Sequence, residues 1–261
     1  MENLLIIAVV FLLGTIIGSF VGLCAYRIPR RETILWGGSR CDYCDEPLPW
    51  RYKFPLLGYL LLKGRSACCH RPIPLRYPLT ELTTGVLFLV LFYDLGPDVQ
   101  LPVAAVFVGL LLVGALIDLQ SGIIPNRLTA AGVAVGVGLS AVLHQGWPVD
   151  ALLGVVICGG FLYLGGVLGE VLFGAHDGMG GGDIKFAAMI GAFLGWQMGL
   201  LAVVLAALTG VVFGGARMAV QPEGVAHREI RFGPFLAGGA LVGLLWGHAV
   251  WDWYLSLIGG F

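Results

Sequence analysis

The chain has 261 residues, of which 58% are hydrophobic and only 12% are charged. A soluble domain carries roughly 45–50% apolar and about 25% charged residues, so this composition excludes an ordinary soluble protein and makes a lipid bilayer the expected surrounding. The formal net charge of −1 says nothing about nucleic-acid or acidic partners, whereas the placement of the charges is informative. We expect the lipid bilayer as a partner and no nucleic acid.

The first predicted element is a transmembrane helix within residues 1–25, where an apolar run begins at Leu4. No basic region precedes this run, whereas Arg27, Arg30 and Arg31 follow it. A secretory signal peptide has the opposite order of charges, so we expect a first span that is retained.

Residues 26–78 form the segment that is large enough to fold as a small domain outside the membrane. Ten of the fifteen Lys and Arg residues lie in this loop, between Arg27 and Arg76. Basic loops stay on the cytoplasmic side of a membrane, so we expect a cytoplasmic loop domain and place both chain termini on the outside.

This loop domain contains the pair Cys41-x-x-Cys44 and the adjacent residues Cys68 and Cys69. Two CxxC knuckles at such a separation usually hold one four-coordinate structural zinc ion, because tight turns present their thiolates together. The pattern therefore predicts a zinc site with these four cysteines as ligands.

The second knuckle is irregular, because Ser66 stands where a regular CxxC would have its first cysteine. Beside Cys69, either Cys68 or His70 could supply the fourth ligand. A redox-active cysteine pair is the alternative use, but a cytoplasmic loop normally keeps its thiols reduced. Zinc binding remains the expected role.

Residues 79–261 carry the remaining apolar runs and form the predicted membrane-embedded part. These runs cover about 79–95, 100–117, 128–145, 151–173, 185–195, 197–219 and 233–256. Most approach the roughly 17–25 residues that cross a bilayer as a helix, so the chain is predicted to be an all-α integral membrane protein with about eight transmembrane helices. The run at 185–195 gives only about 16 Å of helix, which predicts a partial or re-entrant span.

Asp118 ends the apolar run 100–117, immediately before a turn-forming stretch from Ser121 to Asn126. A carboxylate at the end of a membrane helix can simply reach interfacial water. Taken alone, Asp118 therefore fits an interfacial side chain as well as it fits a functional acid.

Asp183 follows a glycine-rich segment, residues 178–182. Each glycine costs a helix about 1 kcal/mol relative to alanine, but glycine permits positive φ and the close approach of another backbone. We therefore predict a loop that holds an extended substrate against Asp183. A flexible turn with an N-capping Asp is the plainer alternative, and Asp177 is a rival acid. The residues predicted to support this loop are Gly178, Gly180, Gly182 and Lys185.

On the predicted topology, Asp118 and Asp183 lie at the same cytoplasmic boundary although 65 residues separate them. Two carboxylates at close range share one proton, because both cannot easily ionise together. The ionised acid can then accept a proton from water while the protonated acid donates to the carbonyl of a peptide bond. The pair predicts an aspartic peptidase with both acids catalytic.

The resemblance to a known family rests on several motifs. Gly180-Gly181-Gly182-Asp183 is similar to the signature of the GxGD membrane proteases, and Asp118 with Ile124-Pro125-Asn126 resembles the other catalytic motif of bacterial type IV prepilin peptidases. The N-terminal motifs that resemble the bifunctional members of this family are Gly18-Ser19-Phe20, Tyr26-Arg27-Ile28-Pro29, Cys41 with Cys44, Pro49-Trp50 and the stretch Arg76 to Glu81.

The resemblance implies an enzyme of the bacterial inner membrane. It would remove the leader from type IV prepilins or from the pseudopilins of type II secretion at the cytoplasmic face. It would then methylate the new N-terminal residue with S-adenosylmethionine, and the cysteine loop would bind zinc and serve the methylation. Ser66 departs from the family pattern, so a peptidase without methylase activity is one alternative. A transporter with buried acids and a scaffold for pilus assembly are two others.

Overall fold

The structure is a computed structural model that describes residues 2–34, 38, 40–41, 43–143, 148–173, 179–220 and 231–258. Within these ranges the regular elements are helices, apart from two isolated β-bridges. The all-α prediction is therefore confirmed. The chain divides into an N-terminal unit, Met1–Ala105, and a C-terminal unit, Val106–Phe261, and each is described by itself.

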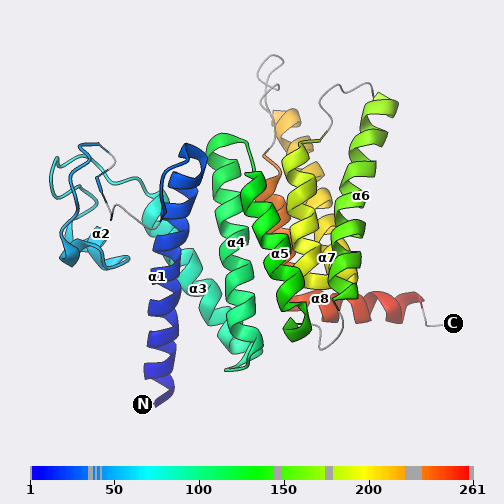
Figure 1. Ribbon diagram of the computed structural model, residues 1–261, viewed down its shortest axis with the longest axis horizontal. Coiled ribbons are helices and arrows are strands. Elements are labelled where there is room, and N and C mark those ends of the chain that lie inside the picture. The colour runs from blue at the N-terminus through cyan, green and yellow to red at the C-terminus, as the bar shows by residue number, and fades with distance from the viewer. Residues whose placement is uncertain are drawn as a thin grey trace. The chain divides into compact units, whose positions relative to one another are not determined.

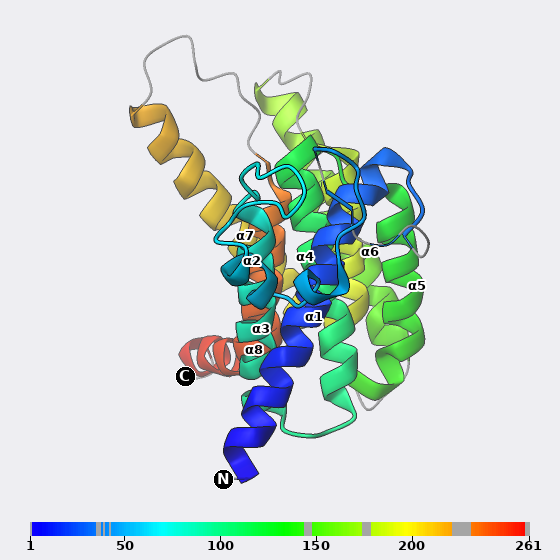
Figure 2. The same ribbon diagram turned by 90° about the vertical axis from the view of Figure 1, so that its left-hand side faces the viewer.

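The N-terminal unit is built on two long helices, α1 (Glu2–Arg30) and α3 (Arg76–Leu95), which pack against each other (Figure 2). Small residues allow this contact: a Cβ added at Gly18 would lie 2.8 Å from the Cα of Glu81. Among the described residues between these helices, the helical elements are a short 3-10 helix, η1 (Trp50–Tyr52), and the single turn α2 (Leu57–Leu61). The described part of this segment is therefore mostly irregular loop.

Helix α1 ends five residues beyond the predicted first span. Its last turn contains Arg27 and Arg30, and the guanidinium of Arg30 lies 3.7 Å from the centre of the Tyr26 ring. Cations stabilise the negative end of a helix dipole, which explains why the helix continues past the apolar run.

The C-terminal unit is a bundle of long helices, most of which run side by side, whereas the C-terminal part of the last helix, drawn in red, runs across the others (Figure 1). They are α4 (Gln100–Ser121), which starts within the N-terminal unit, α5 (Asn126–Leu143), α6 (Val149–Phe173), α7 (Gly181–Val220) and α8 (Gly233–Ile258). Helix α7 packs against α5, α6 and α8, so it is the centre of this unit.

Helix α7 consists of two arms that meet at Gly195, where the backbone has φ 75° and leaves the helical region. A Cβ added at Gly199 would lie only 3.0 Å from the Cα of Gly191. In a straight helix eight residues rise about 12 Å. The two arms must therefore fold back on each other, and glycine at position 195 permits this turn.

The first arm of α7, residues 181–194, is about 21 Å long and is enclosed by protein. The ring of Phe193 stacks on Phe107 of α4 at 4.6 Å between centroids. On α6, Gly154 meets the backbone of Gly191 directly, which only glycine allows. Burial of this arm satisfies the condition under which a short helix is tolerated at membrane depth, and the partial or re-entrant span expected for 185–195 stays a prediction.

Six described helices are long and apolar enough to cross a bilayer: α1, α3, α4, α6, α7 and α8. The outer face of α6 fits a lipid surrounding, because Val156, Val171 and Leu172 are each about 70% exposed. These observations confirm a multi-pass membrane protein. The count of eight spans is not confirmed, because α5 is not among the six and the two arms of α7 count as one helix.

Candidate functional site

Asp118 occupies the last turn of α4 and is only 5% exposed. The helix ends three residues later, where Gly122 adopts φ +68° and donates its N–H to the carbonyl oxygen of Asp118 at 2.8 Å. This left-handed glycine cap explains why α4 stops here. The acid is thus held at the end of a buried helix and not on a flexible loop.

The side chain of Asp118 has a partner from the far end of the sequence. Its Oδ2 accepts the backbone N–H of Gly233, the first residue of α8, at 2.9 Å. Arg231 donates from Nη1 to the carbonyl oxygen of Asp118 at 2.7 Å and also to that of Leu119. The start of α8 therefore fixes both the backbone and the carboxylate of this acid.

Asp183 lies in the first turn of α7, where its N–H donates to the carbonyl oxygen of Gly180 at 2.9 Å. A Cβ added at Gly180 would lie 3.0 Å from Oδ2 of Asp183, so glycine leaves room for the carboxylate. Gly182 lies against Ile124, with 3.2 Å between an added Cβ and the Cβ of that residue. Two residues named from the sequence, Gly178 and the rival acid Asp177, lie outside the described residues.

The two acids lie close enough for the charge of one to influence the other. Packing between α4 and α7 sets this register. One turn before Asp118, a Cβ at Gly114 would lie 2.8 Å from Cζ of Phe186, which is itself one turn after Asp183. Residues three or four apart share a helix face, so this contact turns both acids toward each other.

Lys185 ties the start of α7 to the start of α5. Its Nζ donates to Oδ1 of Asn126 at 2.8 Å. Asn126 is the first residue of α5 and ends the connection that leads from Asp118. The predicted supporting residues Gly180, Gly182 and Lys185 therefore all lie around the Asp183 turn or the connection facing it.

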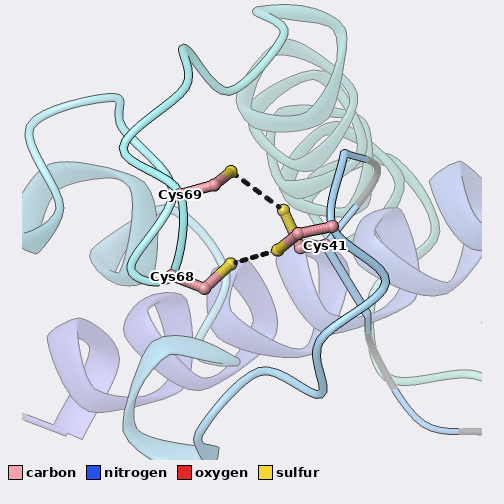
Figure 3. A group of neighbouring side chains, drawn as sticks. Cys41, Cys68 and Cys69 are labelled. Carbon is pink, nitrogen blue, oxygen red and sulfur yellow. Dashed lines mark hydrogen bonds between the residues drawn. The ribbon is translucent and has the colours of Figure 1, made fainter.

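A second cluster lies in the loop of the N-terminal unit. The sulfur atoms of Cys41, Cys44, Cys68 and Cys69 all lie within 4.8 Å of one another. Figure 3 shows Cys68 and Cys69 pointing toward Cys41. Measured between Sγ atoms, Cys41 is 3.6 Å from Cys69 and Cys44 is 2.9 Å from Cys68. The structure thus brings together the four cysteines that the sequence singled out, and His70 is not part of this group.

The two knuckles have the same backbone path. A β-bridge joins Arg40 to Pro47 in the first, and another joins Arg65 to Pro72 in the second. The N–H of Cys41 donates to the carbonyl of Glu46, and the N–H of Ser66 donates to that of Arg71. Ser66 therefore occupies the position equivalent to Cys41.

Ser66 remains part of the cluster although it is not a thiol. Its Oγ lies 3.2 Å from Sγ of Cys41 and 3.1 Å from Sγ of Cys68. The sulfur that a regular knuckle would place at position 66 is supplied by Cys68, two residues later. Spacing alone had left Cys68 and His70 open.

The electrostatics of the cluster favour a cation. Burial acts to raise the pKa of the Cys41 thiol, but hydrogen bonds from Ser66 and from the N–H groups of Tyr43 and Cys44 outweigh it and lower the pKa to about 6. The neighbouring Cys68 raises the pKa of Cys44 to about 12. Four thiolates at this range repel one another, so full ionisation requires a bound metal ion.

Sequence reasoning missed Arg231 and Gly233 as residues of the aspartate site. Arg231 is one of fifteen Lys and Arg residues, and Gly233 is one of 41 glycines. The sequence Gly233-Pro234 at the start of the last apolar run was the available signal, because proline is favoured in the first turn of a helix. This signal does not indicate that the N–H of Gly233 forms a hydrogen bond with Asp118.

Comparisons with known protein families divide the chain into two parts that resemble the two structural units. Residues 12–95 match a family model described as the Bacterial Peptidase A24 N-terminal domain, and residues 105–215 match the Type IV leader peptidase family. The boundary between these matches falls beside the boundary between the two structural units. No solved structure matches the chain.

Individual relatives share one name, prepilin leader peptidase/N-methyltransferase. The protein from Klebsiella pneumoniae is 37% identical over 194 residues, which is 72% of this chain and 84% of that protein. The protein from Myxococcus xanthus is 36% identical over 210 residues, covering 78% and 61%. The protein from Bacillus subtilis is 32% identical over 256 residues, covering 96% and 98%.

Proposed function

The chain belongs to the type IV leader peptidase family, and from this membership we propose that it cleaves the leader peptides of type IV prepilins or pseudopilins with Asp118 and Asp183 as its catalytic pair. The observation that carries the proposal is that two acids 65 residues apart in the sequence, one of them buried, lie close enough for their charges to influence each other. Nothing lies within 4 Å of a Cβ added at Gly181, two residues before Asp183, and we propose that the substrate backbone approaches the acid there.

The pair supports hydrolysis through a shared proton. The ionised carboxylate accepts a proton from a water molecule, whose oxygen attacks the scissile carbonyl carbon. The protonated carboxyl donates to the carbonyl oxygen, which gives a tetrahedral diol. Collapse of the diol breaks the C–N bond and transfers a proton to the leaving amine, so the leader ends in a carboxyl group and the pilin begins with a free amine.

We further propose methylation of that amine, as the names of the relatives suggest. S-adenosylmethionine supplies an electrophilic methyl group: the amine lone pair forms the N–C bond, the C–S bond electrons pass to sulfur, and the amine releases a proton. The chain's own task is to bind the donor and to hold the amine in its neutral form beside it.

The protein crosses the bacterial inner membrane several times. We propose that its N-terminus faces outward and that the residue 26–78 loop and the catalytic pair face the cytoplasm. Supporting this orientation, ten of fifteen Lys and Arg residues lie in that one loop. The proposed division is a first span in residues 1–25, the loop domain, and a membrane-embedded peptidase domain in residues 79–261.

We propose that the cysteine cluster holds a structural zinc ion through Cys41, Cys44, Cys68 and Cys69. Zinc binds thiolates at about 2.3 Å in a tetrahedron, which places sulfur atoms about 3.8 Å apart. The 3.6 Å between Cys41 and Cys69 and the 4.8 Å limit for the whole group fit this geometry with small side-chain movements. The donor set is thus suited to zinc.

Replacing Cys68 with alanine is expected to lower bound zinc from about one ion per chain to less than about half, because three ligands hold the ion far more weakly. The double variant Ser66→Cys/Cys68→Ala is expected to regain the ion, since position 66 is equivalent to the ligand position Cys41. Metal analysis of purified protein measures both. Cys24→Ala, a buried cysteine of α1, is the matched control. Full zinc in Cys68→Ala, or almost none in the unaltered protein, would contradict this assignment.

Replacing Lys185 with methionine is expected to slow leader cleavage roughly 10-fold. It removes a charged hydrogen bond between the start of α7, which carries Asp183, and the start of α5, which follows the turn after Asp118. Asn126→Ala removes the same bond from the other side. If the bond acts as inferred, the double variant is no slower than the slower single variant, and initial cleavage rates of all four proteins reveal this. Strictly multiplicative losses would show that the two residues act separately.

The proposed function is tested by mixing the purified protein with a prepilin in detergent or in vesicles. We expect a product shortened by its leader and, when S-adenosylmethionine is added, a mass gain of one methyl group on its first residue. A shortened product without the methyl group would show that the protein is a peptidase without methylase activity. An unchanged prepilin would favour the transporter or scaffold alternatives.

A further inference from the structure

The N-terminal unit contains a cavity of about 620 Å³ that takes no part in the aspartate site. Small-molecule sites typically occupy roughly 300–1,000 Å³, so the cavity has the size of a metabolite site. It lies among the last turns of α1, the cysteine loop and the first turns of α3. Residues that carry the argument are Ser19, Tyr52, Tyr59, Glu81, Cys41 and Cys44.

Glu81 contributes a carboxylate to the lining of the cavity. Its Oε2 accepts the backbone N–H of Leu56 at 2.8 Å, and the hydroxyl of Ser19 also hydrogen-bonds to this carboxylate. A half-buried carboxylate held in this way is a suitable acceptor for the hydroxyl groups of a ribose or for an ammonium group.

The walls are aromatic and partly cationic. The cavity is lined by four aromatic side chains, Tyr52, Phe54, Tyr59 and Tyr77. Lys53, which lies between Tyr52 and Phe54 in the sequence, also lines it. Aromatic faces suit both a purine ring and a positively charged sulfonium group, and a lysine suits a carboxylate. A ligand with a nucleoside, a sulfonium and an amino-acid end would match these groups together.

The cavity also borders the cysteine cluster, because Cys41 and Cys44 are part of its lining. A metal ion that cross-links the two knuckles would therefore hold one wall of the cavity in place. All of the lining residues fall within the match to the N-terminal domain model, residues 12–95. None falls within residues 105–215, which match the leader peptidase model.

We propose that this cavity is the site where the methyl donor, S-adenosylmethionine, binds, with Glu81 as the acceptor for its ribose hydroxyls or its ammonium group and the tyrosines around its adenine and sulfonium. The proposal rests on the methylation proposed above. It also gives the cysteine cluster a physical role in that reaction, because loss of the metal would open the wall of the donor site.

The test compares Glu81→Gln with Glu46→Gln, which changes an exposed glutamate of the cysteine loop that does not line the cavity. Glutamine keeps an oxygen for the N–H of Leu56, so the fold should survive, and a melting curve in detergent checks this. Calorimetry with S-adenosylhomocysteine is expected to give affinity at least about 10-fold weaker for Glu81→Gln and unchanged affinity for Glu46→Gln.

A second readout needs no variant. Ultraviolet irradiation with radiolabelled S-adenosylmethionine, followed by peptide mapping, is expected to label peptides within residues 19–81. Wild-type affinity in Glu81→Gln, or label confined to residues 106–261, would overturn the cavity assignment. Methyl transfer by the unaltered protein is measured first, because it separates the cavity assignment from the proposed methylation. Methyl transfer with the donor bound elsewhere would overturn the cavity assignment alone. The absence of both methyl transfer and donor binding would overturn the proposed methylation as well.

Discussion

Replacing Asp118 or Asp183 with asparagine is expected to reduce leader cleavage at least about 10³-fold while the protein remains folded in the membrane. Asparagine has nearly the same shape, and its amide oxygen can still accept the N–H of Gly233 that Asp118 accepts. It cannot exchange a proton with water or with the scissile carbonyl, and general acid or base catalysis alone contributes roughly 10²–10⁴-fold. The measurement is the initial rate of leader removal from a purified prepilin.

The matched control is Asp150→Asn, which changes an exposed acid in the first turn of α6. It should leave the rate unchanged. The double variant Asp118→Asn/Asp183→Asn should be no slower than either single variant, because acids that share one proton act as a unit and their losses do not multiply. Normal cleavage by either single variant would exclude the two-aspartate mechanism.

Much of the fold could be predicted from the lengths of apolar runs, because the bilayer sets how long a spanning helix must be. The fold-back of α7 at Gly195 is only partly visible in the sequence. Trp196 and Gln197 interrupt the apolar pattern there, but a positive φ at one glycine among 41 cannot be identified without tertiary contacts. The packing of Gly199 on Gly191 is such a contact, and it shows that the two arms reverse.

The candidate site was predictable where its chemistry is local. Asp183 stands in a short motif, and Asp118 ends a clear apolar run, so both could be named in advance. The contact of Gly233 with Asp118 spans 115 residues and involves a backbone N–H, which every residue except proline possesses. Such a contact leaves no side-chain signature in a single sequence.

The substitution Gly233→Ala, which adds a single methyl group, is expected to slow leader cleavage roughly 10²-fold. A Cβ at position 233 would lie 2.8 Å from Oδ2, 2.9 Å from Cβ and 3.1 Å from Cγ of Asp118. These distances are too short, so the carboxylate must move away from its place facing Asp183. A misplacement of about 1 Å in a catalytic group can cost about 10²-fold in rate.

The loss should appear in kcat rather than in KM, because the glycine turn before Asp183, where we propose that the substrate backbone binds, is untouched. Alanine is a better helix former than glycine by about 1 kcal/mol, so a fall in activity could not be attributed to a weaker α8. Gly238→Ala, in the same helix with nothing within 4 Å of its added Cβ, controls for this and should keep full activity. Equal rates for the two variants would mean that α4 alone positions Asp118. A selective loss at position 233 would mean that the start of α8 is part of the peptidase site, although it lies outside the 105–215 segment that matches the leader peptidase family.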